Sequence, residues 1–363
     1  MENQSNLNEL EQFNKEIRTK ALGRMKKRTP QQLSGSWFND DLLYSGIGKT
    51  VYIIVPTPGC SWALGDSGGC TMCSYISDCT LEPVDDNEIF ELFKDEFEKY
   101  ELVGQTAVKI FASGSFLNPL EVSINVRNNI LKYLGENEFV SEVIVESRPE
   151  YVDESTIDDV FSFLGNKLFE ISIGLESSND FTREEKINKG FSKKDFERVI
   201  NLINSLKNKY NIKSKAYSLV KPILTNEKEA IDEAIETAKY CGAIGVDRIS
   251  FTPTTIHRGT LVEQLWRRGA YQPPWIWTTV EIINSVRNEI AIPSFMDTSG
   301  FGSRRGPYNC KKCNKELKHR IIDSNLNQSL IEYECDCKGE WKAIVSNADL
   351  NKSKTFIRHL PLV

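Results

Sequence analysis

The stretch VYIIVPTPGCSWALGDSGGCTMCSY, residues 51–75, decides the architecture of this chain. Its first five residues are β-branched and aromatic, which is typical of a buried strand. A glycine-rich loop follows at once and carries Cys60, Cys70 and Cys73 in a C-x9-C-x2-C arrangement. The stretch therefore predicts a strand whose C-terminal end opens into a loop that gathers three thiols.

The pattern of a strand followed by a helix repeats along the sequence. The further β-rich runs are AVKIF (107–111), SEVIVES (141–147), LFEISIGL (168–175), KAYSLV (215–220) and DRISFTP (247–253). The segments with helical periodicity are 85–102, 119–134, 153–164, 193–209, 226–241 and 259–268. Six alternations predict an α/β fold with parallel strands, either a partial (β/α)6 barrel or a doubly wound sheet.

The placement of the unusual residues favours the barrel. Polar residues and glycines lie at or just beyond the C-terminal ends of the predicted strands, where barrels of this kind place their chemistry. They are Cys60, Ser113, Gly114, Ser115, Glu146, Glu176 and the TPTT segment at 252–255. We therefore expect one catalytic face at this end of the barrel.

The composition is that of an ordinary globular protein of 363 residues, with 40% hydrophobic and 26% charged residues. We divide it into a basic N-terminal extension (1–47), the partial barrel (48–298) and a four-cysteine C-terminal module (299–363). No apolar run is long enough to cross a bilayer and the polar start does not resemble a secretory signal, so we expect a cytoplasmic protein without a membrane partner. The net charge of −6 gives no global case for nucleic-acid binding, so any such surface must be local.

Nine cysteines indicate metal rather than disulfides, because the cytoplasm keeps thiols reduced. Thiolates at Cys60, Cys70 and Cys73 can hold three irons of a [4Fe–4S] cluster and leave the fourth iron open to an exchangeable ligand. A zinc knuckle is the alternative, disfavoured because no histidine lies nearby as a fourth ligand, and simple buried cysteines are another. We interpret Cys79 as a non-ligand.

A second group of cysteines, in the C-terminal module, has close to zinc-ribbon spacing. Its members are Cys310, Cys313, Cys335 and Cys337. Four thiolates complete a closed tetrahedral site that can hold a small segment together, so we predict structural zinc, with a second iron–sulfur cluster as the rival. The first half of this module is basic, which suits either RNA or a merely solvated face.

The loop at 60–73 resembles that of the radical S-adenosylmethionine (SAM) superfamily, although the usual first gap is shorter and Met72 occupies the usual aromatic position. The longer spacing is similar to that of the Elongator catalytic subunit. The resemblance implies a [4Fe–4S] cluster on the three cysteines, with SAM bound beside it. The implied SAM contacts are Ser113, Gly114 and Ser115 in SGSF, Glu146 and Arg148 in VESRPEY, and Glu176 in SIGLESSND. For the charged residues a structural ion pair is the alternative, and Lys189 is a further candidate.

Three segments narrow the resemblance to the radical SAM enzymes of archaeosine synthesis. They are GTLVEQLWRRGAYQPPWIWT (259–278), SGFGSRRGPYNC (299–310) and the four-cysteine tail. The resemblance implies a lyase that cleaves the C–N bond at the lysine side chain of a lysine adduct on 7-deazaguanine in the D-loop of transfer RNA, leaving archaeosine. Its implied partners are the tRNA, the lysine-transferring archaeosine synthase subunit and an electron donor.

Several interpretations stay open at this stage. The tryptophan-rich segment 266–277, with Arg267 and Arg268, suits either RNA or packing against the barrel, and His257 suits either substrate or a structural role. Another Elongator-like radical SAM enzyme is the alternative function, although too few residues follow the barrel for an acetyl-CoA-binding domain. A non-catalytic iron–sulfur or zinc scaffold for RNA or a partner is the second alternative, and it would not need SAM.

Overall fold

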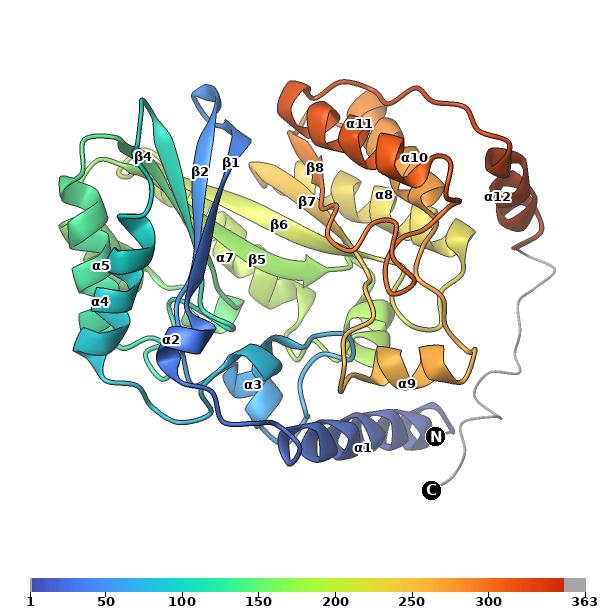
Figure 1. Ribbon diagram of the computed structural model, residues 1–363, viewed down its shortest axis with the longest axis horizontal. Helices are drawn as coiled ribbons and strands as arrows, with labels where there is room; N and C mark the ends of the chain where they lie inside the picture. Colours follow the sequence, from blue (N-terminus) through green and yellow to red (C-terminus); the bar gives the residue numbers. More distant parts are fainter. Residues whose placement is uncertain (1, 349–363) are drawn as a thin grey trace.

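The computed structural model describes residues 2–348, with side chains from residue 11 onward, and is built around one curled eight-stranded sheet (Figure 1). The strands are β1 (Gly35–Leu43), β2 (Gly46–Ile54), β3 (Thr106–Phe111), β4 (Val140–Glu146), β5 (Leu168–Glu176), β6 (Ile212–Val220), β7 (Arg248–Pro253) and β8 (Ser294–Met296). They lie in the order of the sequence. β1 is antiparallel to β2, and every other neighbouring pair is parallel.

Helices connect the parallel strands and cover the outer face of the sheet (Figure 1). The helices of the described chain are α1 (Glu2–Leu22), α2 (Pro30–Leu33), α3 (Ser61–Leu64), α4 (Asp86–Phe97), α5 (Ile124–Glu136), α6 (Glu154–Leu164), α7 (Lys193–Leu206), α8 (Glu227–Ala243), α9 (Leu261–Arg267), α10 (Ile276–Glu289), α11 (Asn314–Asn327) and α12 (Cys337–Ser346). Short 3₁₀ turns occur at Tyr75–Asp78 and Pro149–Tyr151, and a π-helical turn at Thr182–Lys186. Within residues 2–348, no helix combines the length and apolar character needed to span a bilayer.

The two faces of the sheet differ in polarity because the strands alternate. On β4, Val143 and Val145 are fully buried in the core shared with the outer helices. Glu142 and Glu146 occupy the alternate positions and face the inside of the curl, since successive side chains of a strand point to opposite faces. The inner face is therefore polar, which suits a surface that meets a polar ligand.

A contact across the sheet demonstrates its curl. Lys109 of β3 donates a hydrogen bond to the hydroxyl of Tyr217 on β6, although β4 and β5 lie between these strands. Two side chains can meet across two intervening strands only if the sheet bends around them. The fold is thus a half-barrel, as the sequence predicted.

All six predicted strands are confirmed, and two edge strands are added to them. β1 lies within the segment 1–47 that the sequence predicted as an extension, so the sheet begins at Gly35. Its aspartates and its antiparallel pairing hide it from a search for buried parallel strands. β8 has only three residues, too few for a recognisable pattern.

The C-terminal module closes the open side of the half-barrel. α11 contacts both edge strands, β1 and β8. Cys313, Leu317 and Trp341 belong to the same apolar core as the barrel, so the module packs as part of one body. Its described residues contain helices and loops but no strand, and residues 349–363 lie outside the described part of the protein.

Candidate active site at the barrel mouth

The three-cysteine loop lies at the C-terminal end of β2. Cys60 caps the start of α3, and Cys70 and Cys73 follow the glycine-rich turn, where Gly68 and Gly69 have positive φ angles. All three thiols are free, and Cys70 is the most buried of them. Burial and the neighbouring Cys70 raise the pKa of Cys73 to about 12, while burial and Glu121 raise the pKa of Cys60. Three thiolates in this place need a positively charged partner, which fits an iron–sulfur cluster.

Cys79 packs beside Cys60 in a small cluster with Ala63 and Ile76. Its side chain is 3% exposed and its thiol donates a hydrogen bond to the carbonyl of Ile76 at 2.9 Å. It packs behind Gly59, where an added Cβ would lie only 2.7 Å from the Cys79 sulfur. This arrangement favours the non-ligand interpretation of Cys79.

The loop after β3 is tied to the cysteine loop by a residue that the sequence did not single out. Glu121 is 3% exposed and accepts hydrogen bonds from the backbone N–H groups of Ser61 at 2.8 Å and Ser115 at 2.5 Å. A Cβ added at Gly114 would lie 2.0 Å from a carboxylate oxygen of Glu121 and 3.1 Å from the Cα of Cys60. Ser113 holds a positive φ of 49°, a conformation that costs free energy and clusters at functional sites. The predicted Ser113, Gly114 and Ser115 therefore lie beside the cysteine loop.

Glu146 ends β4 and faces the interior. Its carboxylate lies 3.6 Å from the ammonium of Lys109, which also contacts Tyr217. The same carboxylate raises the pKa of Tyr75, two residues beyond Cys73. Glu146 thus joins the cysteine loop to the polar interior of the half-barrel.

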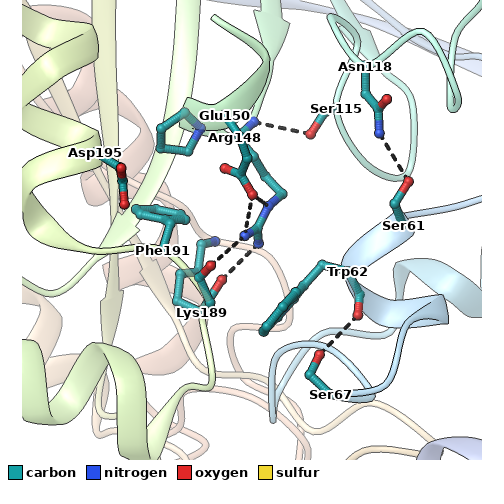
Figure 2. A network of polar contacts seen from close by, with 12 residues as sticks. Ser61, Trp62, Ser67, Ser115, Asn118, Arg148, Glu150, Lys189, Phe191 and Asp195 are labelled. Atoms are coloured by element: carbon teal, nitrogen blue, oxygen red, sulfur yellow. Dashed lines mark hydrogen bonds and ion pairs between the residues drawn. The ribbon is translucent and has the colours of Figure 1, made fainter.

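Arg148 directs all three nitrogens of its guanidinium at protein acceptors (Figure 2). It donates to Glu150 at 2.7 Å and to the carbonyls of Lys189 and Gly190 at 2.8 and 3.2 Å. It also lies over the ring of Trp62 in α3, at 5.0 Å from the centroid. These contacts favour the ion-pair alternative, in which Arg148 fixes the cysteine loop against the segment 187–191.

Glu176 and Lys189 form a buried ion pair at the end of β5. Their oxygen and nitrogen are 2.8 Å apart, with side chains 9% and 12% exposed. Burial by itself would lower the pKa of Lys189. The nearby Glu176 carboxylate nevertheless raises this pKa, and Cys70 adds to the increase. Glu176 holds a positive φ of 65° at a shift in the β5–β6 register, so both backbone and charge are unusual at this predicted site residue.

Two asparagines that the sequence did not single out hold the glycine-rich turn from opposite sides. Asn14 of α1 donates to the carbonyl of Gly69 at 2.7 Å, and Asn188 donates to the same carbonyl at 2.8 Å. The indole of Trp62 in turn donates to the carbonyl of Asn188 at 2.8 Å. α1 runs past α3 and α9 on this side of the molecule (Figure 1). The only sequence signal for Asn14 was a polar side chain on the same helical face as Phe13 and Ile17.

The second cysteine group converges on a single point. The sulfur pairs Cys310–Cys313, Cys310–Cys335 and Cys313–Cys337 are 3.4, 3.7 and 3.6 Å apart, and all four sulfurs lie within 4.8 Å of one another. Although burial opposes it, hydrogen bonds from the Cys313 backbone and thiol lower the pKa of Cys310 to about 7. The indole of Trp277 donates to the Cys337 sulfur at 3.3 Å. The site is a metal-binding group with its supporting hydrogen bonds in place.

Comparison with known proteins places the chain in a family. An archaeosine synthase subunit beta from Methanosarcina acetivorans is 36% identical over 330 residues, 90% of this chain and 93% of that protein. The subunit beta of Thermococcus kodakarensis is 32% identical over 324 residues, 87% of this chain and 97% of that protein. The chain belongs to the archaeosine synthase subunit beta family. An uncharacterized protein of Methanocaldococcus jannaschii is 39% identical over 94% of both proteins, and no protein-family profile matches.

Among solved structures, the half-barrel of this archaeosine synthase subunit beta relative is similar to the archaeal Elp3 of Methanocaldococcus infernus. The TM-score is 0.49 at 13% identity, covering 67% of this chain and 60% of that one. The radical SAM methyltransferase TsrM of Kitasatospora setae, with cobalamin and a [4Fe–4S] cluster bound, gives a TM-score of 0.40 at 13% identity, covering 61% and 40%.

The rim of the mouth in this subunit beta family member is built by the SRRGP segment. The carbonyl of Arg305 accepts a hydrogen bond from the backbone N–H of Ile256, and its guanidinium donates one to the carbonyl of Ile256. The guanidinium also pairs with Glu263 at 3.1 Å. His257 directly follows Ile256, and its ring is hydrogen-bonded to the hydroxyl of Thr255 at 2.6 Å. Burial lowers the pKa of His257. Arg267 also pairs with Glu263, at 2.8 Å. Arg305 and Arg267 thus have structural partners, whereas Arg304 and Arg258 are exposed.

Replacing Glu263 with glutamine should destabilise the protein in a pH-dependent manner. Burial by itself would raise the pKa of Glu263. Hydrogen bonds from the Gly259 backbone and from Arg267 and Arg305 nevertheless lower this pKa from 4.5. A lowered folded-state pKa contributes stability that is present above the unfolded value and is lost as pH falls through the folded value. We expect the free energy of unfolding to fall by about 2 kcal/mol at pH 7, with no difference from the wild type in acid below the folded pKa.

Urea unfolding of the wild type and of Glu263→Gln, from pH 7 down to acid below the folded-state pKa, measures the effect. Glu82→Gln is the matched control, because its pair with Lys27 is exposed on the surface, where solvent screens it and it should contribute little to stability. A Glu263→Gln deficit that persists unchanged in acid would contradict the ionic origin of the stabilisation.

Proposed function

We propose that this protein is the radical SAM subunit that completes archaeosine formation in transfer RNA. In this proposal Cys60, Cys70 and Cys73 hold a [4Fe–4S] cluster, and the enzyme is a lyase that cleaves the C–N bond at the lysine side chain of a lysine adduct. The observation that carries the proposal is the three-thiol loop at the polar mouth of a half-barrel, in a protein whose relatives are named archaeosine synthase subunit beta.

The residues around the loop are suited to bind SAM. Ser113, Gly114 and Ser115 would present the backbone beside Cys60, and Glu146 and Glu176 would accept hydrogen bonds from hydroxyl or ammonium groups. Arg148 contributes by holding the loop, through its contacts with Trp62 and residues 189–190. When bound, the cluster and SAM supply a 5′-deoxyadenosyl radical able to abstract hydrogen from an unactivated carbon.

The polar interior supports a substrate with a charged amino-acid end. The lysine of the adduct carries an α-carboxylate and an α-ammonium group at the end farthest from the RNA. Lys109 offers a cation and Glu146 a carboxylate, 3.6 Å apart. The ammonium of Lys109 would therefore pair with the α-carboxylate of the substrate, and the carboxylate of Glu146 with its α-ammonium group. Holding this end would fix the reacting carbon of the lysine for hydrogen abstraction.

The remaining partners follow from the family name. A subunit beta implies a partner subunit, which we assign as the lysine-transferring archaeosine synthase, and the reaction requires an electron donor and the tRNA. The exposed Arg258 and Arg304 at the rim are suited to phosphate contacts. Within the module, the exposed Lys311, Lys312 and Lys315 extend this basic character.

We assign zinc to the Cys310, Cys313, Cys335 and Cys337 group. A tetrahedral ion with bonds of about 2.3 Å to sulfur places its ligands roughly 3.8 Å apart, close to the 3.4–3.7 Å of three sulfur pairs here. A second iron–sulfur cluster would need thiolates on different irons and hence a wider arrangement.

The proposal is tested by the product on the RNA. The protein, reconstituted anaerobically with iron and sulfide, is incubated with SAM, dithionite and tRNA that carries the lysine adduct. Mass spectrometry of the digested RNA should reveal archaeosine, and tRNA with the unmodified nitrile base should be returned unchanged. Loss of adduct without archaeosine, or no reaction in a protein with a full cluster, would refute the lyase assignment.

A further inference from the structure

Arg18 is a buried cation that is hydrogen-bonded to the backbone of the cysteine loop. It lies on α1 with 3% of its surface exposed. Its guanidinium donates to the carbonyls of Gly68 at 3.0 Å, Cys70 at 3.3 Å and Cys73 at 2.7 Å. Two of these three residues are the predicted cluster ligands, so the positive charge is bonded directly to the backbone of the cysteine loop.

Arg18 has no carboxylate partner among the described side chains. The other buried arginines do: Arg183 pairs with Asp180 at 2.6 Å, and Arg127 pairs with Asp159. Burying a cation without a counter-charge is strongly unfavourable. Once a cluster is bound, the thiolates of Cys70 and Cys73, whose carbonyls Arg18 binds, would supply its counter-charge.

We infer that Arg18 is a positioning residue whose buried charge favours the reduced state of the iron–sulfur cluster. This inference rests on the proposed cluster. One-electron reduction adds one negative charge to the cluster, taken from a low-potential reductant such as dithionite, and no bond forms or breaks. A fixed positive charge in a weakly screened interior stabilises that added charge, and local charge is one determinant of cluster potential.

The test is a redox titration of reconstituted full-length protein, in which electron paramagnetic resonance follows the reduced cluster. Arg18→Gln removes the charge and keeps a hydrogen-bond donor, whereas Arg18→Lys keeps the charge and loses the three-way grip. We expect Arg18→Gln to shift the reduction equilibrium at least tenfold toward the oxidised state, which is about 59 mV for one electron. Arg18→Lys should stay near the wild-type midpoint, even if less of it carries a cluster, because the signal reports only the loaded fraction.

Two controls separate charge from structure. Arg24→Gln removes the same charge from an exposed position, where solvent and salt screen it, and should leave the midpoint unchanged. Asn14→Ala removes the neighbouring hydrogen bond to Gly69 without a change of charge, and should lower cluster occupancy at an unchanged midpoint.

The outcomes distinguish the inference from the proposed function. A wild-type protein that takes up no cluster on its three cysteines refutes the proposed function itself. A loaded Arg18→Gln protein with the wild-type midpoint, or an equal shift in Arg24→Gln, refutes only the role of Arg18. If Arg18→Gln retains no cluster, Arg18→Lys decides, because a loaded lysine variant shifted tenfold would overturn the inference.

Discussion

Cys60→Ala is expected to lose the iron–sulfur absorbance and to lower substrate-dependent 5′-deoxyadenosine formation by more than about a hundredfold. Residues that merely support a metal ligand cost about 10–100-fold, and Cys60 is proposed to be a ligand itself. We expect the neighbouring Cys79 not to replace it, because the Cys79 thiol is bonded to the carbonyl of Ile76. Iron analysis, visible absorption and chromatography of 5′-deoxyadenosine together measure the effect.

Cys241→Ala is the matched control for that experiment. Cys241 is fully buried in α8 and is part of the apolar core, so its replacement should leave iron content and activity unchanged. Full cluster content in Cys60→Ala, or iron loss in Cys241→Ala equal to that in Cys60→Ala, would contradict the ligand assignment.

Cys313→Ser is expected to remove the metal from the C-terminal module and to destabilise the whole protein. Cys313 is fully buried in the core that the module shares with the barrel, and α11 contacts both edge strands of the sheet. Because a structural metal contributes its binding energy to folding, we expect the melting temperature to fall on the order of 10 °C. Metal analysis and calorimetry measure the two effects.

The control for the module is Lys311→Ala, an exposed position next to the metal ligand Cys310. It should leave both metal content and melting temperature unchanged. A Cys313→Ser protein that melts with the wild type would contradict a structural role for the metal, and iron and sulfide in place of zinc in the purified wild-type module would overturn the choice of metal.

Much of the fold could be predicted because its buried strands have a strong local signal. Runs such as VYIIV and EVIVE pack one face under helices, and the residues after them are polar or glycine. β1 escaped because Asn39, Asp40 and Asp41 interrupt its apolar residues, and its Asp41 accepts hydrogen bonds from Thr50 and Tyr52. Such a strand is defined by its partner rather than by its own composition.

The site residues that escaped act through the backbone of distant segments. Arg18, Asn14, Asn188 and Glu121 bond carbonyl or N–H groups that lie from 6 to 121 positions away. Backbone groups are the same at every residue, so no spacing in the sequence marks such contacts. The cysteines, by contrast, are rare and chemically distinct, and their spacing predicted two metal groups.

Arg148 illustrates a different limit. Its place at the mouth could be predicted from the sequence, but a guanidinium can serve a ligand or the protein equally well. Glu150, two residues further on, and the carbonyls of Lys189 and Gly190 accept its hydrogen bonds. Only the folded arrangement reveals that those acceptors are within reach.

The central claim, that this half-barrel performs radical chemistry on a lysine adduct, is tested most directly by counting 5′-deoxyadenosine. Reconstituted protein with SAM and dithionite is assayed with lysine-adducted tRNA and, in parallel, with tRNA that carries the nitrile base. We predict 5′-deoxyadenosine that rises only with the adduct and matches archaeosine mole for mole. A protein with a full cluster that forms no 5′-deoxyadenosine with the adduct, or forms it equally with both RNAs, would contradict the claim.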